Sequence, residues 1–415
     1  MNSYNPMAIR LAIVLWFGLF FISCKNEKNE KNESGSEVFP EEKFVQSIPD
    51  EFILRYTDKV VDSMDTNKAN FDGTERAGTN KRAVANKLAT ELRKLDSKAT
   101  VLGFTERFAL IKTGLGKNAL SSLLGSSRIQ SVQQNYVIKF KFEEIRKFTG
   151  STKEHIPWNI LRVGGGRYSV INARAWVLDT GVDQTHKDIN YDVSYSASFV
   201  PGEVAGRDSK GHGTHIAGII GARANGEGVV GVAPNVRISS VKVIDKDGSL
   251  NYGRYLQALD YVALHAESGD VVNLSFVSNQ IEPNAIELEL LELIVGKASI
   301  VIAAGNATNN TNGVRQDIND VPKVFPAAYN MQGVYTVSAC DKNDQLASFS
   351  NYGLGVDYAE PGVEILSTVP GGYGYDSGTS MAAPHLVGLL LKGNVKSNSF
   401  LKSDLDGQPD PIGTN

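Results

Sequence analysis

From about residue 151 onward, short apolar runs alternate with segments of helical periodicity. The runs RAWVLD, RISSVKVID, DVVNLSF and ASIVIAAGN are rich in β-branched residues and almost continuously apolar, as expected for strands that are buried on both faces. Between them, GTHIAGIIGAR, YGRYLQALDYVALHAE and AIELELLELIVGK have the apolar spacing of helices. Strands that alternate with helices predict an α/β fold with a doubly wound parallel sheet over residues 153–394.

Residues 42–142 have a different pattern. The segment AVANKLATELRKL places Val84, Leu88, Leu92 and Leu95 on one face of a helix. IPDEFILRYTD and TERFALIKTG predict strands, and NALSSLLGSSRIQSVQQNYVIKF predicts a short helix and a closing strand. The order strand, helix, strand, helix, strand predicts a small α+β domain in front of the doubly wound one.

Residues 1–23 predict an export signal. Arg10 precedes the apolar run Leu11–Ile22, which is shorter than the ~20 residues that a membrane-spanning helix needs. Cys24 follows directly, and FISC resembles the cleavage box of bacterial lipoproteins, although Phe21 stands where leucine is commonest. The resemblance implies that Cys24 carries lipid; ordinary signal cleavage and an uncleaved anchor are the alternatives.

A polar segment, residues 24–41, follows the signal. It contains KNE three times in succession and has no apolar periodicity, which predicts a flexible linker that holds the protein away from a membrane.

Composition and charge narrow the class of protein. The chain has 415 residues, 41% of them hydrophobic and 21% charged, which is ordinary for a globular protein. A net charge of −4 gives no support to nucleic-acid binding, which needs a basic surface. The cysteines are Cys24 and Cys340, so a lipid on Cys24 leaves no disulfide partner, and stability must come from the core or from bound metal. Cys340, in YTVSACDK, is predicted to be a small buried hydrophobic residue.

Polar residues stand at the carboxyl ends of the predicted strands. Asp179 closes AWVLD, Ser275 closes VVNLS and Asn306 closes IVIAAGN. In open parallel sheets, ligand sites form beyond these ends. His212 opens a helical segment in GHGTHIAG, and Ser380 stands among small residues in DSGTSMAAPH. A helix that begins at Ser380 would direct its N–H groups at a reacting carbonyl group.

These residue types together support acyl transfer. A serine hydroxyl is a weak nucleophile, an imidazole can accept its proton, and a buried carboxylate fixes the imidazole tautomer. The chain order is Asp179, His212, Ser380, which is one of the known orders of such triads. His215 and His385 belong to no recognisable metal motif, and we expect them to be structural.

The segments VLDTGVD, GHGTHIAG and GTSMAAPH resemble the three signature motifs of the subtilisin-like serine proteases, and AAGN resembles the segment that carries their oxyanion asparagine. The resemblance covers most of the latter two-thirds of the chain. It implies a serine endopeptidase that works through an acyl-enzyme. In it, Asp179 orients His212, His212 is general base and acid, and Ser380 is the nucleophile. Asn306 and the backbone N–H of Ser380 would hold the oxyanion.

IPDEFILRYTD and VQQNYVIKF also resemble the inhibitory propeptide of this family. The resemblance implies that residues 42–142 assist folding, lie across the groove as an intramolecular inhibitor and are removed by self-cleavage between about Phe142 and Glu154. A parallel sheet with long-range pairing folds slowly, which gives a folding helper a physical purpose. The alternatives are a surface-tethered binding protein with an inert protease core, and an esterase on the same scaffold.

The resemblance further implies that substrate binds as an added strand between two edge segments. The matching residues are Gly248, Ser249, Leu250, Ser275, Phe276 and Val277. Val277 stands where the family usually has glycine, so its branched side chain is expected to narrow the groove. No acidic residue is expected in the primary pocket near Ala303, Ala304 and Val324, which predicts a preference for apolar or uncharged side chains.

Many members of the family bind calcium, a cation that needs several oxygen ligands. The loop ANGEGVVGVAP resembles their calcium loop, and Asp188, Asn225 and Glu154 match ligand positions. The alternative is a plain glycine-rich surface loop.

Residues 395–415 are expected to be a C-terminal tail. The predictions together describe a monomeric, self-processing protease that acts on proteins or peptides. Its expected location is the cell envelope or cell surface as a lipoprotein, or otherwise the extracellular medium.

Overall fold

The computed structural model describes residues 45–56, 76–105, 107–123, 129–150, 153–280, 283–307, 314–320, 323–393 and 395–415. All of them belong to one compact unit, Lys43–Asn415. The predicted signal at 1–23, the linker at 24–41 and Cys24 lie outside the described residues. No helix among the described residues has the length and apolar character that crossing a bilayer requires.

A nine-stranded sheet forms the centre of the described structure, in the order β18-β19-β15-β14-β12-β10-β6-β8-β7. Its strands are β6 (Arg174–Asp179), β7 (Ala197–Ser198), β8 (Arg237–Lys242), β10 (Val271–Leu274), β12 (Ser299–Ala303), β14 (Val334–Cys340), β15 (Tyr358–Pro361), β18 (Lys396–Phe400) and β19 (Pro411–Thr414). Neighbouring strands are parallel except β18 and β19, which are antiparallel.

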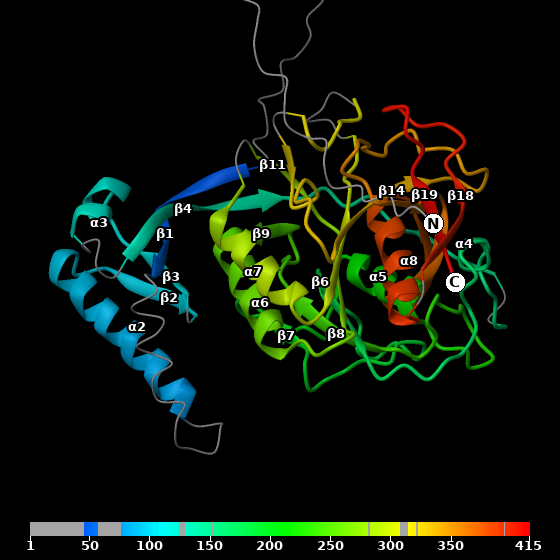
Figure 1. Ribbon diagram of the computed structural model, residues 1–415. Helices are drawn as coiled ribbons and strands as arrows, with labels where there is room; N and C mark the ends of the chain where they lie inside the picture. The colour runs from blue at the N-terminus through cyan, green and yellow to red at the C-terminus, as the bar shows by residue number, and fades with distance from the viewer. Residues whose placement is uncertain are drawn as a thin grey trace, which may run out of the picture. The chain divides into compact units, whose positions relative to one another are not determined.

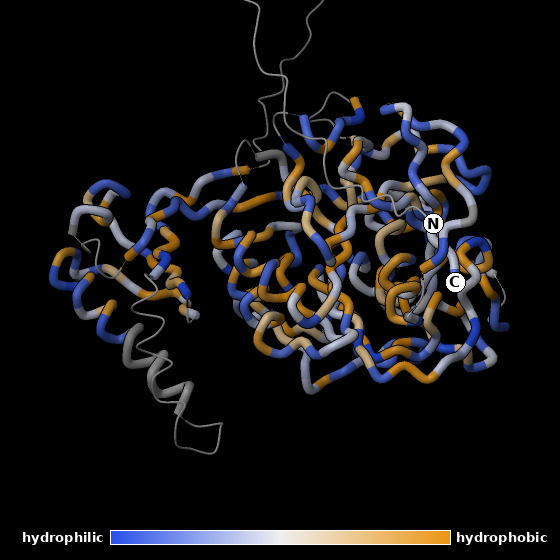
Figure 2. Tube along the Cα trace, in the orientation of Figure 1, coloured by the Kyte–Doolittle hydropathy of each residue, from blue (hydrophilic) through white to orange (hydrophobic). Residues whose placement is uncertain are grey.

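Helices cover both faces of this sheet (Figure 1). They are α4 (Trp158–Arg162), α5 (His212–Gly221), α6 (Tyr252–His265), α7 (Ala285–Val295) and α8 (Thr379–Leu391). Along β6, Trp176 and Leu178 pack into the core beneath α6 and α7. Ala175 and Val177 of the same strand pack into a second core with α5 and α8. Figure 2 shows apolar residues along the inner strands and helices and polar residues in the outer loops. The predicted doubly wound α/β fold is confirmed.

The N-terminal part forms a five-stranded antiparallel sheet in the order β2-β3-β1-β4-β9. Its elements are β1 (Val45–Tyr56), α2 (Arg76–Leu95), β2 (Thr100–Phe104), β3 (Phe108–Lys112), α3 (Lys117–Leu123), β4 (Ile129–Lys139) and, from after residue 153, β9 (Ser249–Asn251). Leu88 and Leu92 of α2 are buried against one face of the sheet, as the periodicity predicts. The sequence pattern missed β2, whose five residues are too short and too exposed to give a clear alternation.

The other face of this small sheet joins the main core. Ile53, Phe108, Leu110 and Ile138 are buried together with the side chains of α6 and α7. The N-terminal part is therefore packed on the helices that follow β9, through apolar contacts as well as strand pairing.

Two further strand groups lie near the carboxyl ends of the central strands. β16 (Ile365–Val369) and β17 (Gly372–Asp376) form a hairpin that β5 (Arg146–Lys147) extends. β11 (Ser278–Gln280) pairs with β13 (Lys323–Phe325). These short strands shape the edge of the sheet where the polar residues singled out above are found.

Residues 395–415 do not form the expected tail. β19 pairs with β15 of the main sheet, and β18 pairs with β19. Leu401 and Ile412 are buried against Cys340, so this segment completes a small apolar cluster. Its strand PIGT is short and the edge strand KSNSF is polar, which hid both strands from the apolar pattern. Burial raises the pKa of the Cys340 thiol, in keeping with the predicted hydrophobic role.

Candidate active site

Asp179 and His212 meet at the carboxyl end of the sheet. Asp179 is the last residue of β6 and is fully buried, and His212 is the first residue of α5. Nδ1 of His212 lies 2.8 Å from Oδ1 and 3.0 Å from Oδ2 of Asp179. Thr180 also donates to Oδ1 through its backbone N–H at 2.7 Å and its hydroxyl at 3.0 Å. The carboxylate therefore fixes Nδ1 of the imidazole as the protonated nitrogen and leaves Nε2 available.

A second buried carboxylate, Asp208, holds the turn that leads into α5. It accepts hydrogen bonds from the hydroxyl of Thr180 at 2.9 Å, the N–H of Gly211 at 2.8 Å, and the N–H and hydroxyl of Thr214 at 2.8 and 2.7 Å. Gly211 has a φ of 85°, a left-handed conformation that favours glycine. Asp208 thus satisfies the free N–H groups at the start of the helix and fixes the position of His212.

The imidazole of His212 is surrounded by acidic groups. Burial by itself lowers its pKa, but the charge and hydrogen bond of Asp179, followed by the charges of Asp376 and Asp208, raise the pKa above the ordinary value of 6.5. Burial also raises the pKa of Asp376, while the charge of His212 lowers it. His212 is therefore easier to protonate than an isolated histidine.

Ser380 lies at the N-terminus of α8, as the sequence predicts. Its hydroxyl donates to the carbonyl oxygen of Ser275 at 3.0 Å, and the hydroxyl of Ser275 donates to the carbonyl oxygen of Ser380 at 3.1 Å. No hydrogen bond joins Ser380 to His212 within the described structure. Ser275 therefore anchors the first turn of α8 to the end of β10.

Asn306 lies beside the same helix start. Its Oδ1 accepts from the N–H and the hydroxyl of Thr379 at 3.0 and 2.9 Å, which fixes the direction of the amide. A side chain at Gly378 would begin 3.3 Å from Nδ2 of Asn306 and 3.7 Å from the backbone nitrogen of Ser380. These two nitrogens therefore border one small space next to Ser380.

The chain's own N-terminal part runs through this site. Val137, Ile138 and Lys139 of β4 pair with β9, and the N–H of Phe140 donates to the carbonyl oxygen of Gly248 at 2.9 Å. The ring of Phe142 then lies edge-on to His212, with 4.9 Å between ring centroids. Beyond it, β5 pairs with β17. Residues 137–147 thus cross the site as an extended chain that is held at both ends.

The two predicted groove segments contact this chain differently. Gly248, Ser249 and Leu250 contact it through the strand pairing just described. Phe276 contacts it through its ring, 5.9 Å from that of Phe140. The side chain of Val277 lies against Gly305: its Cγ2 lies 2.6 Å from where a Cβ on Gly305 would be. Its side chain occupies space that the glycine usual in the family would leave open.

The three residues predicted to bind calcium lie around one loop. Asp188 is buried, and its carboxylate accepts from the amide of Asn225 at 3.0 Å and from the hydroxyl of Tyr373 at 2.7 Å. Oε2 of Glu154 accepts from the N–H of Gly226 at 2.7 Å. The described residues contain no group of three or more acidic, histidine or cysteine side chains with the arrangement of a metal site.

The other histidines near the site are buried and neutral. Burial lowers the pKa of His215 to about 3 and that of His385 to about 4. His215 bonds to the carbonyl oxygens of Ile365 and Gly374, and His385 bonds to Asn159. These contacts agree with the structural role expected for both.

Comparisons with known proteins identify the family. The profile of the subtilase family matches residues 176–395, which contain Asp179, His212, Asn306 and Ser380. A thermophilic serine proteinase of Bacillus sp. (strain AK1) is 32% identical over 318 residues, covering 74% of this chain and 74% of the relative. The chain belongs to the subtilase family.

Two further relatives agree with this assignment. Subtilisin E of Bacillus subtilis (strain 168) is 30% identical over 310 residues, covering 71% of this chain and 76% of the relative. The crystal structure of a cold adapted subtilisin-like serine proteinase matches with a TM-score of 0.52 and 28% identity, covering 62% of this chain and 97% of that one. The protein is a subtilisin-like serine endopeptidase.

Some residues of this subtilase site have no signature in the sequence motifs. Asp208 is recognisable only as an acidic residue shortly before a helix start. Asp376 and Phe142 reach His212 through long-range contacts that no local pattern reveals.

The acidic surroundings of His212 give a direct prediction. Asp376→Asn removes a negative charge that stabilises the imidazolium, so the pKa of His212 is expected to fall. NMR titration of the imidazole in a Ser380→Ala background measures this. Glu364→Gln, in the turn before β16 with a side chain that is 71% exposed, is the control and is expected to leave the pKa unchanged. An unchanged or raised pKa in Asp376→Asn would contradict the electrostatic account.

Proposed function

We propose that this endopeptidase hydrolyses peptide bonds with Asp179, His212 and Ser380 as its triad and that it is made as a self-processing zymogen. The observation that carries the proposal is the passage of residues 137–147 across His212, because a segment bound in this way has the geometry of a substrate strand. The N-terminal part then serves as an intramolecular inhibitor until its connection is cut.

The first half of the proposed reaction uses His212 as a base. The hydroxyl of Ser380 turns from the carbonyl of Ser275 toward Nε2 of His212 and gives up its proton as its oxygen attacks the substrate carbonyl. The fully buried Asp179 stabilises the imidazolium that forms. His212 then protonates the leaving amine, and an acyl-enzyme on Ser380 remains. Water attacks this ester with the same base, and Ser380 is released.

Negative charge that develops on the carbonyl oxygen needs fixed donors. Nδ2 of Asn306 and the N–H of Ser380 border the same space, which supports their assignment as the oxyanion donors. The two bonds from Thr379 hold the amide of Asn306 so that Nδ2 faces that space. The start of α8 adds the positive end of its dipole.

The raised pKa of His212 sets the pH dependence of this mechanism. Only neutral imidazole accepts the proton of Ser380, so activity is expected to fall as pH drops through the pKa of His212. The acidic groups that raise this pKa also stabilise the imidazolium in the transition state. They therefore restrict activity at low pH and assist the chemical step.

Export and anchoring form a separate part of the proposal. Residues 1–23 would direct export, Cys24 would carry lipid, and residues 24–41 would tether a monomeric protease at the cell envelope or surface; without the lipid the protein would be extracellular. Its partners would then be protein or peptide substrates and its own N-terminal part. The mass of the peptide that contains Cys24 tests this: added acyl chains support the anchor, and an unmodified or absent cysteine rejects it.

Calcium is proposed as a structural ion at the loop that contains Asn225. Asp188, Asn225 and Glu154 supply side-chain oxygens there, and backbone carbonyl groups would complete the shell. The grouping of these three residues around one loop supports the site. The hydroxyl of Tyr373 donates to the carboxylate of Asp188, so a calcium ion would share this carboxylate with Tyr373.

Removal of metal tests the calcium proposal. EDTA is expected to lower the thermal unfolding midpoint of the Ser380→Ala protein, because an ion that binds only the folded state stabilises it. Added calcium should restore the midpoint, and Asp188→Asn should abolish the response. An unchanged midpoint in EDTA would remove calcium from the account.

Ser380 provides the direct test of the enzymatic proposal. Ser380→Ala is expected to lose labelling by a fluorophosphonate probe and to lower kcat by roughly six orders of magnitude, the loss known for the nucleophile of a subtilisin. Ser377→Ala, an exposed serine on the approach to α8, is the matched control and should keep both. Labelling that persists in Ser380→Ala would refute the assignment. Absence of labelling in the unchanged protein would favour an inert binding protein instead.

A further inference from the structure

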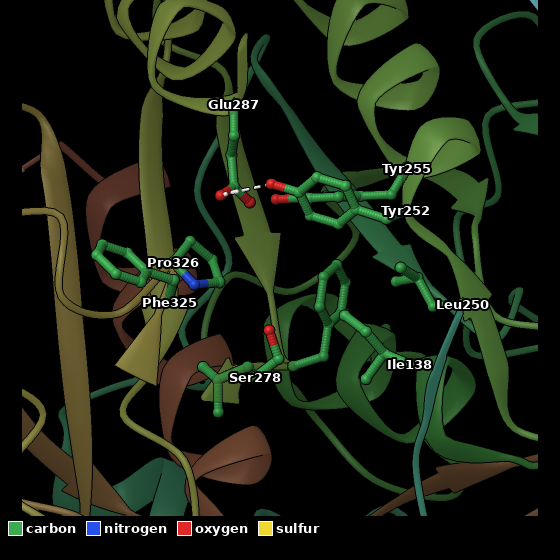
Figure 3. Close-up of a pocket in the computed structure, with 10 residues that line it drawn as sticks. Ile138, Leu250, Tyr252, Tyr255, Ser278, Glu287, Phe325 and Pro326 are labelled. Carbon is green, nitrogen blue, oxygen red and sulfur yellow. Dashed lines mark hydrogen bonds between the residues drawn. The ribbon is translucent and has the colours of Figure 1, made fainter. Parts of the chain in front are cut away.

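A pocket next to the substrate groove combines apolar walls with a buried acidic group (Figure 3). Ile138 of β4 occupies it and is only 5% exposed. Its walls include Leu250, Tyr252, Tyr255, Phe276 and Phe325, and Glu287 lies at one end. Because Ile138 is paired with Leu250 on the strand that leads to His212, release of the N-terminal part vacates the pocket for a substrate side chain.

The acidic end of the pocket is a cluster around Glu287. This residue lies in the first turn of α7 and is 1% exposed. The hydroxyls of Tyr252 and Tyr329 donate to its Oε2 at 3.0 and 2.9 Å. Burial raises the pKa of Glu287, and the tyrosine hydroxyls oppose that shift. Within the described residues the carboxylate has hydrogen bonds but no ion pair with a basic side chain.

The side chain of Ile138 offers this cluster no hydrogen-bond donor. The hydrogen bonds from Tyr252 and Tyr329 both end on Oε2 of Glu287, and Tyr255 is a further hydrogen-bond partner of the carboxylate. The buried hydroxyl of Tyr255 points toward the carboxylate in Figure 3. A space of about 10 Å³ remains beside the lining residues, close to the room that one water molecule needs. A buried carboxylate without a basic partner is costly, so the pocket favours a ligand that supplies a positively charged donor.

We propose that this pocket selects a substrate side chain with an apolar stem and a cationic tip, lysine above all, and that Glu287 is the residue that determines this preference. The inference rests on the proposed peptidase function and names part of its substrate class. The stem would contact Leu250 and Phe276, as Ile138 does. The ammonium group would take the remaining space and donate to Oε1 of Glu287 and to the oxygen of Tyr255.

Lysine fits this pocket better than the other donor-bearing side chains. Its ammonium is compact, carries three donors and sits on a flexible four-carbon stem, whereas the planar guanidinium of arginine needs more room than one water leaves. A glutamine amide would donate but would bring an acceptor oxygen next to a carboxylate. The proposed preference lies outside the primary pocket, which the sequence predicts to be free of acidic residues.

Peptides copied from the chain itself test the proposal. The parent peptide carries residues 135–147, and variants replace the position of Ile138 by lysine, by norleucine or by glutamine. Norleucine keeps the straight stem of lysine and removes its charge. The processed protein is expected to show a kcat/KM for lysine about tenfold above that for norleucine, the size of one charge-assisted hydrogen bond.

In Glu287→Gln, kcat/KM for the lysine peptide is expected to fall to that for the norleucine peptide. The parent peptide with isoleucine should keep its kcat/KM within about twofold. Glu289→Gln removes the same charge from α7 outside the pocket and should keep the ratio. Equal rates for lysine and norleucine in the unchanged enzyme, or a ratio that survives in Glu287→Gln, would overturn the inference. A preference for glutamine over lysine would also overturn it. Failure to cleave any peptide, the parent included, would instead count against the proposed peptidase function.

Discussion

The buried carboxylate of Asp179 is the constraint on which the site is built. An ionised group that is fully removed from water is stable only when its oxygens are occupied, and here His212 and Thr180 occupy them. The parallel sheet places Asp179 at a strand end, and Asp208 fixes both Thr180 and the turn before His212. The folded core therefore fixes the orientation of the His212 imidazole before any substrate binds.

In addition to strand pairing, the N-terminal part meets this core through three kinds of side-chain interaction. Apolar side chains such as Phe108 and Leu110 join the core beneath α6 and α7. Asn135, fully buried, accepts the N–H of Gly253 at 2.8 Å and so occupies the start of α6. Arg107 pairs with Asp260 at 2.8 Å. These contacts stabilise the helices that flank the groove, which fits a segment that assists a slowly forming parallel sheet.

The sequence was sufficient for the parts of the structure that depend on local pattern. Continuous apolar strands predicted the doubly wound sheet, and the motifs around Asp179, His212 and Ser380 predicted residues that the fold brings to one edge. The C-terminal strands were missed because β19 is stabilised by its pairing with β15 and by the burial of Ile412, and neither is visible in PIGT.

Long-range contacts account for the other omissions. Glu287 has the sequence context of an ordinary first-turn acidic residue of a helix, and its cluster with Tyr252 and Tyr329 exists only in three dimensions. Val277 is the intermediate case. Its departure from the family pattern was visible in the sequence, but the contact of its side chain with Gly305 was not.

The central claim is that the chain cuts itself where it crosses His212. Sequencing the new N-terminus of the processed protein, beside the Ser380→Ala variant, tests this most directly. The last anchored residue before the crossing is Phe140 and the next strand begins at Arg146. We predict a new N-terminus between Lys141 and Arg146, and an uncut chain in Ser380→Ala. A cut outside this segment, or the same cut in both proteins, would contradict the account.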